Sequence, residues 1–258
     1  MLTPSATARA YLTAEAPGDL RPYFASLRER PAVRELGDVL RTGEPAAWAS
    51  AAAGEDWAGR LGDPAFAEEF TAAMDARGRV LAPALAQVLA DVPARRVLDI
   101  AGGSGAYGYA LLDARPELHV RVLERPPVDA LARTLLRRRG YASVDVVAGD
   151  MFEGLPSGYD LHLFAHVFHD WDLPDVEALL GASFDALPSG GRVVDYDAHL
   201  GVEPEPAVAA YSALLMHATK GRCYGIGEIS ELMRDVGFVD VEVRPTVGDR
   251  SAVCARRP

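Results

Sequence analysis

The sequence predicts an α/β fold in which a mostly parallel sheet follows a helical N-terminal segment. Five short apolar runs alternate with helical stretches between residues 95 and 198, which is typical of a doubly wound sheet. They read RRVLDIAGG, HVRVLER, VDVVAGD, YDLHLFAHV and GGRVVDYDA. Two more strand-like runs, VDVEVRP and SAVCARR, are separated only by TVGD, so a terminal antiparallel hairpin should complete seven strands.

The first 94 residues are Ala-rich and show no strand pattern. The stretches PAVRELGDVLRTG and PAFAEEFTAAMDARGRVLAPALAQVLADV place apolar residues at helical spacing. Pro31 and Pro64 suit the first turns of these helices, and Asp63 suits an N-cap before the second. We therefore expect a helical segment over residues 1–94 and a sheet domain over residues 95–258.

The amino-acid composition indicates which kinds of molecule the protein binds. The 258 residues carry a formal net charge of −11, which disfavours general binding to nucleic acid or to an anionic membrane surface. The basic stretch RTLLRRRG is then best interpreted as the solvated face of a helix. Two cysteines make neither a disulfide framework nor a zinc pattern, and no apolar run approaches a membrane span or a signal core. A cytoplasmic protein that acts on small molecules is expected.

A glycine loop follows the first strand of the predicted sheet. VLDIAGGSGAYGYALL reads as strand, loop and helix, and contains the G-x-G-x-x-G spacing. Gly102, Gly103 and Gly105 lie in the loop, and Glu124 ends the next strand, where an acid could hold ribose hydroxyls. This pattern alone fits both a nicotinamide dinucleotide and S-adenosylmethionine (SAM).

Two acidic positions favour SAM over the dinucleotide. Asp99 precedes the loop directly, where its carboxylate would repel a pyrophosphate but tolerate an ammonium or a sulfonium. After the third strand, GDMF sets Asp150 before Met151 and Phe152. An acid can accept from the adenine amino group while two apolar side chains pack on the ring.

The stretch HVFHDWD crowds histidines where the fourth strand ends. If His162, His166 and His169 all belonged to a strand, the first two would share one face and His169 would point to the other. We therefore expect no metal site here.

VLDIAGGSG, GDMF, HVFHDWD, SGGRVVDYD and ISELMRDVGF stand in an order that resembles the SAM-dependent O-methyltransferases of the plant caffeate and bacterial polyketide type. The resemblance covers nearly the whole chain, and its HDW box is the specific part. It implies a class I methyltransferase fold, Rossmann-like, with SAM as cofactor. Members usually begin with a winged-helix dimerisation domain, and this sequence starts where that domain ends.

The resemblance also implies roles for particular residues. His169 matches the general base, Asp197 matches a glutamate beside it, and Cys223 stands where a second glutamate is usual. Asp170 and Trp171 are then expected as supports, the tryptophan as a wall of the pocket. The residues that match acceptor-binding positions are Phe70, Met74, His166, Met216 and His217.

The sequence therefore predicts an enzyme of secondary metabolism that methylates a hydroxyl, phenolic in type, on a small aromatic acceptor. The loss of the second acid leaves open a SAM-binding enzyme that does not methylate, catalysing hydroxylation, decarboxylation or cyclisation. An NAD-dependent oxidoreductase and an inactive SAM-binding assembly protein are also compatible with the sequence. Tyr23, Phe24, Trp48 and Trp57 lie outside the sheet domain, and we expect them to contribute to a homodimer contact or to helix packing.

Overall fold

A computed structural model describes residues 3–14, 16–28, 57–201 and 205–258, with isolated positions 33, 35, 37, 38 and 41. The expected helix PAVRELGDVLRTG and Trp48 lie outside the described residues, apart from those isolated positions.

Helices come before the sheet and then alternate with its strands. The described helices are α1 Ala6–Tyr11, α2 Arg21–Leu27, α5 Trp57–Arg60, α6 Pro64–Val88, α7 Ala106–Ala114, α8 Val128–Arg138, the short 3-10 helix η2 Phe168–Asp170, α9 Leu173–Ala186, α10 Pro206–Ala218 and α11 Ile226–Val236. The strands are β1 Arg96–Ile100, β2 His119–Glu124, β3 Asp145–Ala148, β4 Leu161–Ala165, β5 Arg192–Asp197, β6 Val239–Pro245 and β7 Ser251–Arg256.

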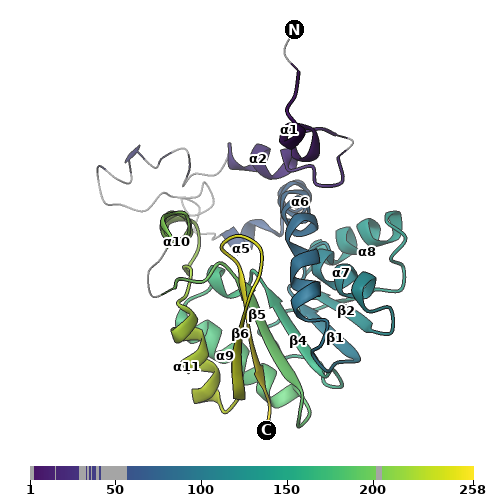
Figure 1. Ribbon diagram of the computed structural model, residues 1–258, viewed down its shortest axis with the longest axis vertical. Coiled ribbons are helices and arrows are strands. Elements are labelled where there is room, and N and C mark those ends of the chain that lie inside the picture. The colour runs from purple at the N-terminus through teal and green to yellow at the C-terminus, as the bar shows by residue number, and fades with distance from the viewer. Residues whose placement is uncertain are drawn as a thin grey trace.

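The seven strands form one sheet in the order β3-β2-β1-β4-β5-β7-β6 (Figure 1). Strands β1 to β5 pair in parallel, while β7 runs antiparallel to both β5 and β6. The predicted parallel sheet and terminal hairpin are confirmed. Because the strand order reverses between β1 and β4, the carboxyl ends of these strands open a crevice for a ligand.

Alternate residues of the strands build two cores, one on each face. On one face, strand residues such as Val97 and Val120 pack with α6, α7 and α8. On the other, Leu98 and Phe164 pack with α9 and α11. This alternation is the period of two that a sheet covered on both faces requires.

Helix α6 belongs to the core of the sheet, although it precedes the expected boundary at residue 94. Asp63 caps it as predicted, since its carboxylate accepts from the backbone N–H groups of Ala65 and Phe66. Leu85 and other buried residues of α6 share one apolar cluster with β1, β2 and β4. A Cβ on Gly78 would lie 2.8 Å from Ala106 Cβ, so this glycine lets α6 approach the start of α7 closely.

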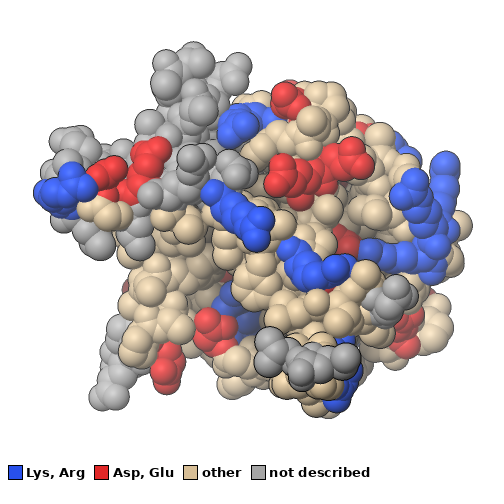
Figure 2. Space-filling view, turned by 90° about the horizontal axis from the view of Figure 1, so that it is seen from above, with Lys and Arg blue, Asp and Glu red and all other residues tan. Residues whose placement is uncertain are grey.

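The basic stretch forms part of α8. Arg133 pairs with Asp129, and Arg139 binds Asp75 of α6 through two hydrogen bonds of 2.5 Å. Arg137 and Arg138 are exposed, and basic side chains gather at the edge of the molecule where α8 lies (Figure 2). This is the solvated helix face that the sequence predicted, and the structure adds ion pairs to it. Among the described helices, none is long and apolar enough to cross a membrane.

Candidate active site

One cavity of about 190 Å³ joins the glycine loop to the HDW box. It opens at the carboxyl ends of β1 to β4, with α6 and α10 as its other walls. The predicted site residues that line it are Phe70, Met74, Gly102, Gly103, Glu124, Asp150, Met151, Phe152, His166 and His169. Residues from widely separated parts of the chain therefore meet in a single site.

The glycine loop is held from below by Asp99. This carboxyl is fully buried, accepts from Gly108 N–H at 3.1 Å and does not line the cavity. A Cβ on Gly102 would lie 2.6 Å from Asp99 Cγ, so only glycine fits above it. Burial raises the pKa of Asp99 to about 7. The structure thus makes Asp99 a support of the loop, whereas the sequence suggested direct contact with the ligand.

Glu124 ties the loop to the end of β2. It accepts from Gly103 N–H at 2.9 Å and from Arg125 N–H at 2.8 Å. Burial raises the pKa of Glu124. Each carboxylate oxygen keeps a second lone pair, so both can still accept from ribose hydroxyls. Gly103 and Gly105 have φ angles of 55° and 78°, and Gly105 turns the chain into α7.

GDMF forms the wall opposite the loop. Asp150 accepts from Phe152 N–H at 2.9 Å, which fixes the turn after β3. Met151 is buried, and the exposed Phe152 packs edge to face on Trp171 at 4.7 Å between ring centroids. Trp171 lines the cavity as predicted. The result is a flat apolar slot with a carboxylate at its rim, which suits an adenine ring.

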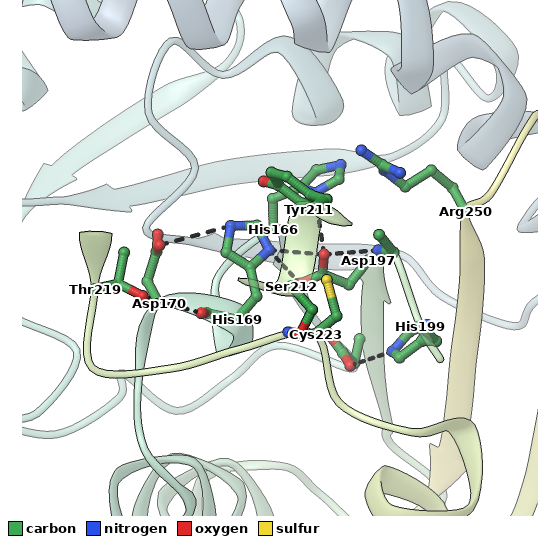
Figure 3. A network of polar contacts seen from close by, with 12 residues as sticks. His166, His169, Asp170, Asp197, His199, Tyr211, Ser212, Thr219, Cys223 and Arg250 are labelled. Carbon is green, nitrogen blue, oxygen red and sulfur yellow. Dashed lines mark hydrogen bonds and ion pairs between the residues drawn. The ribbon is translucent and has the colours of Figure 1, made fainter. Parts of the chain in front are cut away.

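His169 and Asp197 form a buried hydrogen-bonded pair. His169 Nδ1 lies 2.7 Å from the oxygens of Asp197 at the end of β5, and Nε2 faces Asp170 at 3.7 Å (Figure 3). Burial by itself lowers the pKa of His169, but the carboxylates of Asp197 and Asp170 together more than offset this, so the pKa lies above its usual value. Asp197 therefore orients the imidazole and stabilises its protonated form, as acids do for catalytic histidines.

The expectation that His162 and His166 share a face is wrong. His162 bonds Ser183 of α9 at 2.7 Å, whereas His166 lies 3.3 Å from Asp197 on the opposite side of the sheet. Strand β4 ends at Ala165, and His166 has a φ of 58°, so the strand alternation stops there. The turn η2 then brings His169 to the same carboxylate.

His166, His169 and Asp197 offer ligand atoms within 4.8 Å of one another, so they are also a group that could hold a metal ion. The hydrogen bond between His169 and Asp197 already pairs the carboxylate without one. Burial lowers the pKa of His166 well below its usual value, so this histidine is neutral.

Cys223 is fully buried beside this pair (Figure 3). Burial and the nearby Asp197 charge raise the pKa of its thiol to about 12. The thiol therefore stays neutral and cannot act as the anion that a glutamate would supply at this position.

The acceptor wall differs in part from the prediction. Phe70 and Met74 line the cavity, but Met216 is 59% exposed and does not. Tyr211 and Leu215, four residues apart on α10, line the cavity instead. His217 lies in α10, and its side chain is outside the described part of the structure.

Sequence reasoning missed Arg77 and Tyr107, which also line the cavity. Arg77 follows Phe70 and Met74 by seven and three residues, so helical spacing could have placed it on the same face of α6. Tyr107 carried no such signal, because it lies inside the glycine motif as an unspecified residue.

The residues present fit SAM. A loop supported by Glu124 meets an apolar slot with Asp150 at its rim, and the cavity continues to a histidine–aspartate pair. Fold and site together define a class I SAM-dependent methyltransferase.

The comparisons with known proteins agree. The O-methyltransferase domain family matches residues 33–239. The mitomycin biosynthesis 6-O-methyltransferase of Streptomyces lavendulae is 33% identical over 205 residues, which cover 79% of this chain and 58% of that protein. The 3-hydroxy-5-methyl-1-naphthoate 3-O-methyltransferase of Streptomyces sahachiroi is 34% identical over 151 residues, covering 57% and 44%. The chain thus spans about half the length of these relatives.

Solved structures give the same picture. The mitomycin 7-O-methyltransferase MmcR superimposes with a TM-score of 0.84 at 30% identity, covering 98% of this chain and 76% of that one. Human N-acetylserotonin methyltransferase in complex with SAM shares the fold, with a TM-score of 0.87 at 20% identity over 98% and 74%. The chain belongs to the O-methyltransferase family, and its cofactor is SAM. A nicotinamide cofactor is therefore set aside.

Proposed function

We propose that the protein methylates a phenolic hydroxyl of a small aromatic metabolite, with His169 as the general base. The observation that carries this proposal is the pairing of His169 with Asp197 in the cavity that holds the glycine loop. When bound, SAM supplies the methyl group as an electrophile. The two Streptomyces relatives, whose names describe O-methylation in mitomycin biosynthesis and of a hydroxynaphthoate, support an aromatic acceptor.

The chemistry asks His169 to take a proton from a weak acid. A phenol has a pKa near 10 and a free histidine near 6.5, a gap of about 3.5 units or roughly 5 kcal/mol. Asp197 narrows this gap because it raises the pKa of His169. Proton removal coupled to attack on the methyl group lowers the remaining cost. Phe70 and Met74 would pack against the acceptor ring and hold it near the imidazole.

The proposal is tested by incubating the protein with methyl-labelled SAM and a panel of phenols, with mass detection of the products. A labelled methyl ether is the expected product. SAM binding without transfer to any acceptor would favour the inactive assembly protein.

A second function is favoured by the neutral thiol of Cys223, which supplies no anion at the position where the family usually has its second glutamate. It is a SAM-bound enzyme that hydroxylates, decarboxylates or cyclises its substrate without transferring the methyl group. In the same incubation, a product that lacks the label while SAM is not consumed would support it.

We also propose that the N-terminal helices mediate homodimerisation. Tyr11, Leu12 and Phe24 expose apolar surface on α1 and α2, or directly beside α1, which is compatible with a contact between two copies. The ring of Phe24 packs edge to face on Tyr23, and the side chain of Trp57 is outside the described part of the structure. Light scattering at micromolar concentration measures the mass, and a monomer with full activity would remove this contact from the mechanism.

A further inference from the structure

Arg77 stands out among the charged side chains of α6. Asp75 and Arg79 of the same helix pair with each other at 3.3 Å, and Asp75 also binds Arg139. Within the described part of the chain, by contrast, Arg77 forms no ion pair within 4.0 Å. Its Nη1 donates to the hydroxyl of Tyr211 at 3.4 Å, and its buried Nε has no partner among the described residues.

Arg77 is half-buried and lines the cavity. The next residue is Gly78, where α6 lies against Ala106 and Tyr107 of α7. This close contact holds that part of α6 beside the cavity, which Arg77 and Tyr107 both line. Removing a guanidinium from water costs free energy unless an anion or several hydrogen-bond acceptors bind it.

Other buried polar groups near Arg77 also lack hydrogen-bond partners within the described ranges. The hydroxyl of Tyr107 and Nε2 of His166 have none, although these side chains are only 7% and 6% exposed. The two rings lie 5.9 Å apart, and His166 in turn lies 5.6 Å from His169. Unpaired buried polar groups are uncommon in folded proteins, and several around one cavity indicate a polar ligand.

Asp197 does not neutralise Arg77. Its carboxylate is engaged by His169 Nδ1, by Ala198 N–H at 2.7 Å and by His166 at 3.3 Å. Among the described residues Arg77 therefore has no carboxylate within ion-pair distance, which leaves a place for an anionic ligand.

Tyr211 contacts both His169, the proposed base, and the guanidinium of Arg77. Its ring packs edge on to His169 at 5.8 Å, and its hydroxyl accepts from Arg77. His169 and Arg77 thus contact the same tyrosine and line the same cavity, so one aromatic acceptor in that cavity could contact both.

We propose that the acceptor is a hydroxyarene carboxylate: its hydroxyl faces His169, and its carboxylate accepts hydrogen bonds from Arg77 and Tyr107. Arg77 donates only, so its partner must be an acceptor, and the planar guanidinium matches a carboxylate. This inference rests on the proposed function, since it names the class of acceptor for the same site.

The test measures binding, so that it does not depend on methyl transfer. Calorimetry on protein loaded with S-adenosylhomocysteine compares hydroxybenzoates and hydroxynaphthoates with their methyl esters. The proteins are the wild type, Arg77→Gln, Arg77→Lys and, as the matched control on the same helix, Arg79→Gln. Circular dichroism and thermal denaturation show that each variant is folded, and its affinity for S-adenosylhomocysteine alone is measured separately.

The wild type should prefer at least one acid over its ester. Arg77→Gln should weaken that acid by roughly 10- to 150-fold, the scale of a charge-assisted hydrogen bond, and leave the ester unchanged. Arg77→Lys should recover part of the loss, and Arg79→Gln should behave as the wild type.

Three results would overturn the inference. The first is that Arg77→Gln loses equal affinity for acid and ester, the second is that the wild type prefers no acid over its ester, and the third is that Arg77→Gln loses affinity for S-adenosylhomocysteine. The last result would assign Arg77 to the cofactor. If the acid preference holds while no methyl ether forms, the proposed reaction fails and the assignment of the carboxylate site stands.

Discussion

The two ends of the cavity differ in how their polar groups are satisfied. At the cofactor end, Glu124 and Asp150 accept from backbone N–H groups within or beside their own loops. The buried Asp99 beneath the loop accepts from Gly108 N–H through one oxygen, while its Oδ1 has no partner among the described residues. At the acceptor end, Arg77 Nε, the Tyr107 hydroxyl and His166 Nε2 lack partners among the described residues. The side chains that face the cavity at the cofactor end are therefore held by the chain itself, whereas at the acceptor end we propose that a ligand supplies the missing partners.

The largest effect should come from the pair of His169 and Asp197 at the acceptor end. His169→Ala should lower turnover by roughly 10²- to 10⁴-fold, the usual scale of positioned general-base catalysis. Its affinity for S-adenosylhomocysteine should hardly change, since the loop and GDMF are untouched. Single-turnover kinetics and calorimetry measure the two quantities, and equal turnover in the variant would remove His169 from the mechanism.

A metal at His166, His169 and Asp197 would produce the same loss in that variant. Dialysis of the wild type against a chelator separates the two explanations. We expect unchanged turnover, because His169 already pairs the carboxylate. Loss of activity that a divalent cation restores would assign the three residues to a metal.

The cofactor end is tested by Asp150→Ala. Losing a partner for a buried or half-buried donor costs about 1–3 kcal/mol, so affinity for SAM should fall roughly 5- to 150-fold. Turnover at saturating SAM should stay close to that of the wild type. A fall in turnover with unchanged SAM affinity would mean that the two ends are not separate.

Asp197→Asn tests, through the pH dependence of turnover, whether Asp197 raises the pKa of His169. His169 acts as a base only when neutral, and Asp197 raises its pKa, so activity in the wild type should rise with pH through a value above 6.5. Without the charge, burial dominates and lowers the pKa of His169. The acid limb of the turnover profile should move to lower pH, with a smaller loss of turnover than in His169→Ala. An unmoved limb would assign it to another group.

Asp99→Asn concerns the support under the loop. The pKa of Asp99 is about 7 in the folded protein against an ordinary value of 3.8. A raised pKa means that its stabilising contribution is complete below about pH 4 and is lost as pH rises to about 7. The asparagine side chain does not titrate, so the variant keeps its unfolding free energy as pH rises from about 4 to about 7, while that of the wild type falls. The difference between the two should change in favour of the variant by up to about 1.4 kcal/mol per pH unit across that interval. Parallel denaturation curves at all pH values would contradict the burial of a titrating carboxyl.

The smallest effect is expected at Cys223. Because its thiol is neutral, Cys223→Ala should leave turnover and its pH profile nearly unchanged. A large loss, or a shift of the profile, would reveal a thiolate that takes part in the reaction.

Much of the cofactor end was predictable from sequence because each part is local. The glycine loop directly follows its strand, Asp150 accepts from a residue two positions away, and Asp63 caps the helix that begins beside it. Asp99 marks the limit of this reasoning. Its position was clear, but whether its carboxyl faced the ligand or the underside of the loop depended on how α7 packs.

The acceptor end depended on tertiary structure. Strand periodicity could not anticipate that His166 adopts a left-handed backbone and turns His169 onto Asp197. Family resemblance put Met216 in the pocket, but the orientation of α10 presents Tyr211 instead.

The sequence by itself determined the order of strands and helices, the glycine loop, the acids around it and the proposed base. The elements and the loop follow from periodicity and from contacts between residues close in the chain, whereas the proposed base follows from the resemblance of the HDW box to a known family. Only the tertiary structure decided that Arg77 reaches the cavity without an ion pair to the described residues and that Asp197 serves two histidines. Such pairings join residues 28 to 134 positions apart. The pairing of His169 with Asp197 forms only when η2 folds over the end of β5, and the contact of Arg77 with Tyr211 forms only when α6 and α10 meet at the cavity.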